Sequence, residues 1–445
     1  MVALFGTDGV RGVAGVDLTA DLARSLASAA VAVLADGVER PLVVVGRDPR
    51  PSGPWLQEAV VEGLTLAGAD VALLGVIPTP AVARAVADGL PGRVVRPAFG
   101  VVISASHNPA PDNGIKLFGP GGLKLDDATE RQVEASVAET PEATTRGAVV
   151  ADLSGDPAWY VDALVATLPL RLDGLRVVVD CANGAAATVA EAAYRAAGAD
   201  VTVINTDLSG ERINDACGAT HLEAVAAAVV AAGADLGIAH DGDADRCLAV
   251  TSAGAPVDGD VLLAILGLAM KRAGNLSGDL VVVTVMSNLA LHRLFADHDV
   301  TVETTPVGDR HVAERMRATG AALGGEQSGH SVLARYATTG DGILTGLHLL
   351  AALRQADQSL DELAARWVPY PQVLLNVRVT DPRAALAAAE PLAAAATAGL
   401  GEDGRVLVRA SGTEPLVRVM VEAPDADRAR SLAETIAAGI GGDVG

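Results

Sequence analysis

The chain has 445 residues, enough for two to four domains and a large core. It carries 55 acidic and 33 basic residues, and a formal charge of −22 argues against a general binder of nucleic acid or anionic membranes. Half of the residues are hydrophobic but only 2% are aromatic, so the core must consist of Ala, Val, Leu and Ile. So much apolar sequence also argues against intrinsic disorder.

The cysteines indicate a reducing compartment. They are odd in number and form no CxxC pair, which excludes a disulfide scaffold or a cysteine-rich zinc site and predicts a cytoplasmic protein. The first residues lack the basic and apolar regions of a signal peptide, and the longest apolar run, near residues 224–234, is too short to cross a bilayer. The three cysteines are Cys181, Cys217 and Cys247.

Short Val, Ile and Leu runs alternate with Ala-rich helical stretches along most of the chain. This alternation predicts βαβ units, with parallel or mixed sheets covered by helices on both faces. The pattern restarts after polar connections, so we expect three similar α/β domains at residues 1–150, 151–252 and 253–368. The predicted strands are residues 41–46, 71–76, 100–103, 175–180, 200–204, 235–239 and 280–285. The predicted helices are residues 19–35, 54–67, 185–197, 223–232 and 260–272.

The last block, residues 369–445, has a different pattern and predicts a small α+β domain. A strand at 373–379 is followed by a helix that Asp381 and Pro382 mark as an N-cap and a first-turn proline. The Ala-rich stretch 384–400 continues that helix. Two further strands, at 405–408 and 417–421, precede a closing helix at 425–440.

The loop at residues 241–246 carries three alternating carboxylates directly after an apolar strand, where open α/β sheets bind ligands. Asp241, Asp243 and Asp245 would repel one another without a cation, and hard oxygen ligands suit Mg²⁺ or Ca²⁺ rather than zinc. An EF-hand does not fit, because its sixth position is Arg246 and its twelfth is Ser252. The alternative is a solvated acidic turn.

The loop at residues 103–109 reads Ile-Ser-Ala-Ser-His-Asn-Pro and also ends a strand. It has no GxSxG, so a hydrolase elbow is not supported, and its serines need activation or a phosphoryl group to be useful. Lys116 follows shortly, and it indicates a need for a compact ammonium because nearly all other basic residues are arginines. A plain turn and a chance lysine are the alternatives. The lysines of the chain are Lys116, Lys124 and Lys271.

Three further loops carry weaker signals. One of them predicts a phosphate-binding loop, made of Arg409, the small residues after it and Arg418. A plain hairpin turn is the alternative, and the Walker A pattern does not match. Residues 324–330, Gly-Gly-Glu-Gln-Ser-Gly-His, suit sugar hydroxyls but equally a structural turn. Residues 5–12, Phe-Gly-Thr-Asp-Gly-Val-Arg-Gly, are most simply a surface turn.

Together these loops resemble the α-D-phosphohexomutase superfamily. FGTDGVRG and GEQSGH are most similar to the bacterial phosphoglucosamine mutases, whereas phosphomannomutase/phosphoglucomutase relatives, the alternative, usually have GEMSGH. A phosphatase or a non-catalytic sugar-phosphate binder is disfavoured because the serine, the aspartates and the phosphate-binding loop are all present. Ala244 stands where the superfamily commonly has Gly. The matching segments run from residue 5 to 422 and are FGTDGVRG, GRDPRPSG, PTPAV, VISASHNPAPDNGIKLF, VVVDCANGA, INDACGATH, DGDADR, VGDRHV, GGEQSGH, TTGDGIL, YPQVLLNVR and RASGTEPLVRVMVE.

The resemblance implies an isomerase with three similar α/β domains and a C-terminal α+β domain around a central cleft. It implies that glucosamine 6-phosphate and glucosamine 1-phosphate interconvert through a phosphoserine and a 1,6-bisphosphate, for UDP-N-acetylglucosamine and cell-wall precursor synthesis. It also implies one Mg²⁺ per chain and a cytoplasmic homodimer with no nucleic-acid or membrane partner. The implied roles are catalytic for Ser106, Arg11, His107 and Lys116; metal-binding for Ser106, Asp241, Asp243 and Asp245; substrate-binding for Arg246, Glu326, Ser328 and His330; and phosphate-binding for Arg409, Ser411, Gly412, Thr413 and Arg418.

Overall fold

The computed structural model describes residues 4–6, 8–92, 94–138, 143–410, 415–441 and 443–444. The chain forms two compact units. The large unit comprises Met1–Thr284 and Glu303–Ala364, and the C-terminal unit comprises Val285–Val302 and Ala365–Gly445.

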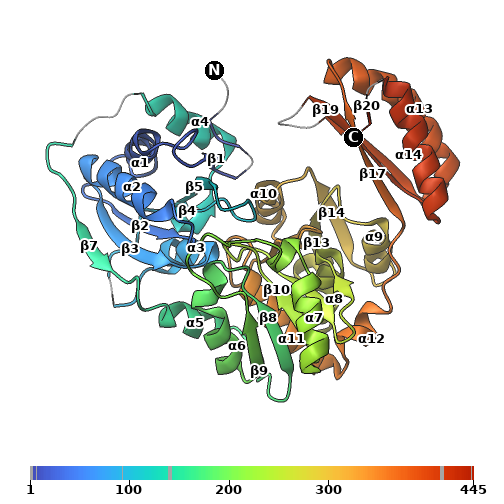
Figure 1. The fold of residues 1–445 in the computed structure, drawn as a ribbon, viewed down its shortest axis with the longest axis horizontal. Coiled ribbons are helices and arrows are strands. Elements are labelled where there is room, and N and C mark those ends of the chain that lie inside the picture. The colour runs from blue at the N-terminus through green and yellow to red at the C-terminus, as the bar shows by residue number, and fades with distance from the viewer. Residues whose placement is uncertain are drawn as a thin grey trace. The chain divides into compact units, whose positions relative to one another are not determined.

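The first sheet of the large unit is mixed, as the βαβ pattern allowed (Figure 1). Its order is β1-β5-β4-β2-β3-β7, with β6 paired to β5. Strands β2, β3, β4 and β7 are parallel, while β5 runs antiparallel to both β1 and β4. The bounds are β1 Val10–Val13, β2 Leu42–Arg47, β3 Asp70–Val76, β4 Phe99–Ile103, β5 Asp112–Gly119, β6 Leu123–Lys124 and β7 Val149–Asp152.

Helices cover both faces of this sheet. The core on one face joins α1 and α2 to alternate residues of β2 and β4, whereas α3 packs against the other face. A Cβ on Gly46 or Gly100 would lie 2.6 Å or 2.9 Å from the Val82 side chain, so these strand glycines permit the close approach of α3. The bounds are α1 Ala20–Leu34, α2 Gly53–Leu66, α3 Thr79–Asp88 and α4 Asp127–Ser136.

The second sheet has the order β12-β11-β10-β8-β9 and the third has β14-β13-β15-β16. Helix α7 covers one face of the second sheet, and α10 packs on β13 and β15 of the third. The second-sheet bounds are β8 Arg176–Asp180, β9 Asp200–Ile204, β10 Leu236–Ala239, β11 Leu248–Thr251 and β12 Pro256–Val257, with α5 Ala158–Val165, α6 Ala190–Ala197 and α7 Glu223–Ala232. The third-sheet bounds are β13 Leu280–Thr284, β14 Thr301–Thr305, β15 Leu323–Gly325 and β16 Ser331–Leu333, with α8 Gly259–Arg272, α10 Asp309–Thr319, α11 Gly342–Ala356 and α12 Leu360–Ala364.

The structure corrects two sequence-based predictions. The helix expected at 185–197 is a 3₁₀ turn, Ala185–Thr188, followed by α6, because Val189 leaves the helical region and the Ala185 amide bonds to the metal loop at Gly242. The turn expected at residues 5–12 becomes strand β1 from Val10 onwards.

The C-terminal unit holds an antiparallel sheet of order β18-β19-β17-β20, with α13 and α14 side by side on it (Figure 1). Asp381 caps α13 as predicted, accepting from the amides of Arg383 and Ala384. The buried carboxylate of Glu422 joins β17, β18 and the start of α9, since Gln372, Arg405 and the Leu289 amide all donate to it. The bounds are α9 Leu289–Ala296, β17 Gln372–Arg378, α13 Pro382–Leu400, β18 Arg405–Ala410, β19 Leu416–Glu422, α14 Ala426–Ile440 and β20 Asp443–Val444.

Among the described residues, α13 is the one helix long and apolar enough to span a membrane by length and composition. A single helix of this kind is weak evidence for a membrane protein. Its buried positions, which include Ala385, Ala389 and Ala396, lie in the hydrophobic core of the C-terminal unit. The helix therefore has a packing role within that core.

Candidate active site

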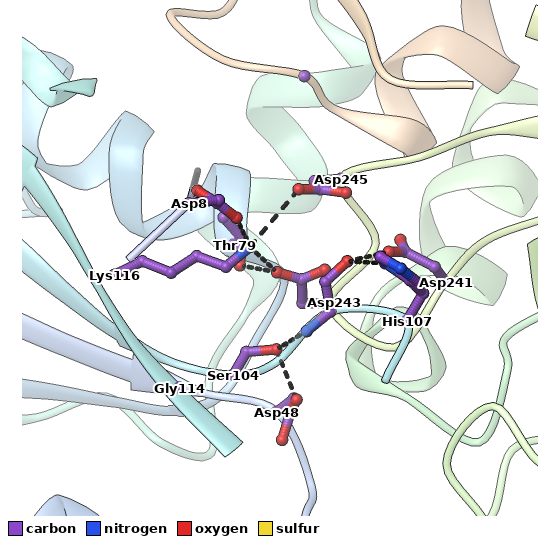
Figure 2. A network of polar contacts seen from close by, with 12 residues as sticks. Asp8, Asp48, Thr79, Ser104, His107, Gly114, Lys116, Asp241, Asp243 and Asp245 are labelled. Atoms are coloured by element: carbon purple, nitrogen blue, oxygen red, sulfur yellow. Dashed lines mark hydrogen bonds and ion pairs between the residues drawn. The ribbon is translucent and has the colours of Figure 1, made fainter. Parts of the chain in front are cut away.

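Three segments of the large unit bring the predicted catalytic and metal-binding residues together. The serine loop, residues 104–112, follows β4, and the metal loop, residues 241–246, follows β10. Lys116 lies on β5, the strand beside β4, so it belongs to the sheet and not to a loop as expected. Figure 2 shows Lys116 extending from this strand towards Asp8, Thr79 and Asp243.

Ser106 is buried and its hydroxyl points at the metal loop. Its Oγ donates a hydrogen bond of 2.6 Å to Asp241 Oδ2 and lies 3.3 Å from His107 Nδ1. Its φ of 53° is in the left-handed region, which a serine adopts only when surrounding contacts hold it there. The predicted meeting of the serine with the aspartates is therefore present in the structure.

The aspartate trio, Asp241, Asp243 and Asp245, fits a cation. One oxygen from each carboxylate lies within 4.8 Å of the others, and all three side chains are buried. Two carboxylate oxygens, Asp243 Oδ1 and Asp245 Oδ1, have no hydrogen-bond partner among the described residues. Burial and then repulsion from the other two aspartates raise the pKa of Asp241 well above its usual value. Unpartnered buried carboxylate oxygens are the donors that a hard divalent cation requires.

Lys116 is a buried cation held by carboxylates. Its Nζ lies 2.6 Å from Asp8 Oδ2, 2.9 Å from Asp243 Oδ2 and 3.7 Å from Asp245 Oδ2. Burial alone would lower the pKa of Lys116, but the carboxylates outweigh it and raise the pKa. The Lys116 ammonium is consequently charged in this arrangement. It donates a hydrogen bond to Asp243 Oδ2, and the Thr79 hydroxyl donates to the same carboxylate oxygen at 2.6 Å.

A second buried lysine, to which the sequence assigned no role, extends this network. Lys124 Nζ donates to Asp8 Oδ1 at 2.7 Å and contacts Asp309 on α10. Asp309 in turn faces His330, which lies 3.6 Å from Asp245. Asp8, Lys124 and Asp309 therefore link the first sheet to the third, and His330 continues the network to Asp245 of the metal loop. The rarity of lysine was the signal that could have singled out Lys124 alongside Lys116.

The remaining predicted charges of the large unit surround the same point. Arg246 lies 4.0 Å from Asp241 and 3.9 Å from Asp245, while Arg11, on β1, pairs with Asp8 at 2.8 Å. Burial and then the positive charges of Arg246 and Arg11 lower the pKa of His107 to about 4, so its ring is neutral at pH 7. The rim of the trio is therefore cationic around a neutral imidazole.

The sugar loop, residues 324–330, is a tight turn between β15 and β16. Glu326 Oε1 accepts from the Gly308 amide at 3.0 Å, and Gln327 donates to Asp258, the N-cap of α8, at 3.1 Å. The Gly340 amide donates to His330 Nε2 at 3.0 Å, which leaves the proton of a neutral ring on Nδ1, facing Asp245. Ser328 Oγ is buried without a hydrogen-bond partner among the described residues.

The phosphate loop, residues 409–418, lies in the C-terminal unit, and only part of it is described. Ser411, Gly412 and Thr413 lie outside the described residues. Arg409 and Arg418 are directly opposite each other on β18 and β19. Two like charges in this register repel, and burial followed by Arg418 lowers the pKa of Arg409. An anion between them would relieve that repulsion.

Known proteins resemble this chain along its whole length. Family models of the phosphoglucomutase/phosphomannomutase alpha/beta/alpha domains I, II and III match residues 2–144, 158–254 and 258–370, and the model of the C-terminal domain matches residues 374–439. A protein of Frankia casuarinae named phosphoglucosamine mutase is 56% identical over 452 residues, covering 98% of each chain.

Two solved structures show the same fold. A phosphoglucomutase/phosphomannomutase family protein from Burkholderia thailandensis superposes with a TM-score of 0.86 at 27% identity, covering 98% of each chain. An Aspergillus fumigatus N-acetylphosphoglucosamine mutase, solved in complex with GlcNAc-6P and magnesium, superposes with a TM-score of 0.67 at 17% identity, covering 99% of this chain and 95% of that one.

The chain belongs to the α-D-phosphohexomutase superfamily and, within it, to the phosphoglucosamine mutase family. The expected architecture, three α/β domains and a C-terminal domain, is thereby confirmed.

Proposed function

We propose that this chain interconverts glucosamine 6-phosphate and glucosamine 1-phosphate, for UDP-N-acetylglucosamine and cell-wall precursor synthesis. Ser106 is the residue that we expect to carry the phosphoryl group. The observation that carries this proposal is the hydrogen bond of 2.6 Å between Ser106 Oγ and Asp241, which places a buried hydroxyl on the aspartate trio. Full-length similarity to the Frankia phosphoglucosamine mutase supports the choice of substrate.

The metal in this proposal is one Mg²⁺ on Asp241, Asp243 and Asp245, with an oxygen on Ser106 as the fourth protein ligand. The unpartnered carboxylate oxygens of the trio support it. When bound, Mg²⁺ would supply charge neutralisation to the phosphoryl oxygens. The magnesium in the Aspergillus structure was found with that protein and its GlcNAc-6P, and it is consistent with this assignment.

The reaction begins with the O1 hydroxyl of glucosamine 6-phosphate attacking the phosphorus on Ser106. The O1–P bond forms as the bond from phosphorus to Ser106 Oγ breaks, and the O1 proton passes to a base. Arg11, His107 and Lys116 are the groups that we place around these oxygens. Lys116 and Arg11 supply positive charge to a transition state whose catalysis is mostly positioning and electrostatics.

The resulting 1,6-bisphosphate then turns end for end. Ser106 Oγ attacks the phosphorus of the 6-phosphate, the Oγ–P bond forms as the O6–P bond breaks, the base returns its proton to O6, and glucosamine 1-phosphate leaves. A sugar held by few contacts can bind both ways round, and we assign those contacts to Arg246, Glu326, Ser328 and His330. The opposed pair Arg409 and Arg418, with Ser411, Gly412 and Thr413, would hold the phosphate that is not reacting.

We also infer that the protein is a cytoplasmic homodimer whose partner in catalysis is a phosphosugar, and neither nucleic acid nor a membrane. The free, buried cysteines support a reducing compartment. Size-exclusion chromatography with light scattering tests the dimer, because a mass near 44.8 kDa at micromolar concentration would mean a monomer.

Intact mass spectrometry tests the phosphoserine directly. After incubation with glucosamine 1,6-bisphosphate, the wild-type chain should gain one phosphoryl group, and Ser106→Ala should gain none and lose nearly all turnover. Ser104→Ala is the comparison variant: it removes the other hydroxyl of the loop but keeps Ser106 Oγ, so the chain should still gain the phosphoryl group, although turnover should fall because Ser104 Oγ accepts the Ser106 N–H. A wild-type chain that never carries the group on Ser106 would refute the mechanism.

Initial rates on glucosamine, glucose and mannose 6-phosphates test the substrate. The proposal predicts the highest kcat/KM for glucosamine 6-phosphate. A higher value for mannose or glucose 6-phosphate would instead support a phosphomannomutase/phosphoglucomutase.

A further inference from the structure

Arg50 is the largest side chain among the described residues to be fully buried. It lies in the turn between β2 and α2, next to the serine loop, and it is not among the proposed catalytic, metal-binding or substrate-binding residues. Burying an arginine is costly unless its donors are all satisfied. Its contacts therefore show what the fold gains from placing it there.

The Arg50 guanidinium uses its five N–H groups almost entirely on the serine loop. Nε donates to Asp48 Oδ2 at 2.9 Å, which also neutralises the charge. The other four N–H groups donate to four backbone carbonyl oxygens. The distances are 3.0 Å to Ser106, 2.8 Å to Asn108 and 2.9 Å to Asp112, and the fourth acceptor is the Pro109 carbonyl. A rigid planar fork is the side chain that can reach four carbonyls at once.

Asn214, which follows β9 of the second sheet, donates to two of the same serine-loop carbonyls. It lies between β9 and α7, and its Nδ2 donates to the Ser106 oxygen at 2.9 Å and to the Asn108 oxygen at 3.1 Å. Both carbonyls thus accept from two donors each, one from Arg50 and one from Asn214. The amide orientation follows from chemistry, because the opposite flip would set an oxygen against two carbonyl oxygens.

The amide side of Ser106 is held by a relay. Its N–H donates to Ser104 Oγ at 2.9 Å, and that hydroxyl donates to Asp48 Oδ2 at 2.6 Å. Asp48 is the same carboxylate that pairs with Arg50. Ser106 is consequently fixed at its nitrogen and at its oxygen by one connected set of buried groups.

The backbone segments that carry Arg50 and Asn214 pack closely against each other and against the serine loop. A Cβ on Gly210 would overlap the Pro49 carbonyl, and one on Gly242 would lie 2.5 Å from the Ser106 carbonyl and 2.8 Å from Asn214 Nδ2. The metal loop, the 210–214 segment and the serine loop therefore meet at the Ser106 carbonyl. A left-handed serine at φ 53° persists because these contacts over-determine it.

We propose that Arg50 and Asn214 are positioning residues that clamp the Ser106 backbone and so aim its Oγ at the aspartate trio. Neither side chain forms a hydrogen bond or ion pair with the trio or Lys116 in the described part of the chain, so they act on the chemistry through Ser106. Because Asn214 lies in the connection that follows β9 of the second sheet, the clamp also fixes the serine loop to the domain that carries the metal loop. The proposal rests on the proposed phosphoserine function.

The primary test is Asn214→Asp, which keeps the shape of the side chain but sets a carboxylate oxygen against the two carbonyls. The expected result is a fall in kcat for glucosamine 6-phosphate of about 100-fold, because a reacting atom about 1 Å out of place costs that much, with KM within roughly threefold. Arg50→Lys should show the same split but can also lose the fold, since an ammonium has three N–H groups and leaves two of the five acceptors of Arg50 without that donor. Hydrogen exchange of the serine-loop amides should speed up in Asn214→Asp.

The matched control is Tyr160→Phe, which removes a buried hydrogen bond of 2.7 Å to Asp341 elsewhere in the large unit. It should lower the melting temperature while keeping kcat and the exchange of the serine loop. An equal loss of kcat in Tyr160→Phe, an unchanged kcat in Asn214→Asp, or a rise in KM alone would each overturn the clamp. A wild-type chain with neither turnover nor phosphoserine would sink the proposed function instead, and the exchange measurement would still test the clamp.

Discussion

Gly242→Ala tests whether the spacing between the metal loop and the serine loop controls turnover. Gly242 lies between two proposed metal ligands, and a methyl group on it would sit 2.5 Å from the Ser106 carbonyl oxygen. The same methyl would lie 2.8 Å from Asn214 Nδ2 and 2.8 Å from Ile213 Cδ1. Because the nearest atom is backbone, no side-chain rotation relieves the overlap.

The size of the effect follows from that distance. Ordinary contacts of a Cβ begin near 3.4 Å, so the two loops must separate by 3.4 − 2.5 = 0.9 Å. Overpacking of this kind costs about 1–3 kcal/mol of stability, which a protein of this size survives. A displacement of about 1 Å between Ser106 and the trio lowers kcat by roughly 100-fold. We therefore expect a folded protein with about 1% of the wild-type turnover.

Coupled kinetics on glucosamine 6-phosphate and a crystal structure of the variant provide the measurement. Ala244→Gly is the matched control in the same loop, because Ala244 holds a left-handed φ of 59° that glycine adopts without strain. It should keep kcat within roughly threefold. The reasoning fails if Gly242→Ala keeps wild-type kcat, or if its Ser106–Asp241 distance is unchanged while kcat falls.

Three further predictions concern pH, charge and metal. Burial raises the pKa of Asp341 from 3.8 to about 6, so its contribution to stability is full below pH 3.8 and is lost as the pH rises through 6. Asp341→Asn should therefore gain about 2 kcal/mol more over wild type at pH 7.5 than at pH 4 in urea unfolding, and an equal gain at both would contradict this. Lys116→Gln should lower kcat by about 10²–10³ by removing the cation beside Asp243, and wild-type kinetics would exclude that role. Exhaustive EDTA treatment should abolish turnover and lower the melting temperature, with Mg²⁺ restoring both; full activity after chelation would refute the metal site.

Much of the architecture follows from local pattern. Parallel strands such as β2 and β8 were predicted to within a residue or two because they are buried on both faces and read as continuous Val runs, whereas the short parallel strands β7 and β15 were not predicted. The break at Val189 was not predicted, because it depends on a hydrogen bond from Ala185 to the distant Gly242. Strand β1 was missed for a similar reason, since FGTDGVRG has turn composition and only pairing with β5 makes it a strand.

The site divides in the same way. The trio could be singled out because three alternating carboxylates follow an apolar strand, whereas the choice of Ser106 over Ser104 came from the family resemblance; the structure places Ser106 against Asp241. The roles of Arg50 and Asn214 could not be predicted from the sequence. Nothing in the sequence distinguishes a buried arginine from a surface one, because burial depends on what the fold packs around it. Lys124 stands between these cases, because its rarity was visible but its pairing with Asp8 and Asp309 was not.

The scarcity of lysine has a practical consequence. Lys116 and Lys124 have only 2% and 7% of their side-chain surface exposed, whereas Lys271 has 27% and lies on a helix away from the aspartate trio. Among the three lysines, amine-reactive dyes should therefore attach to the folded protein at Lys271. Reaction at the other two lysines would require the charged network around Asp8 to open. Labelling stoichiometry over time would thus report how often the catalytic centre of the resting protein comes apart.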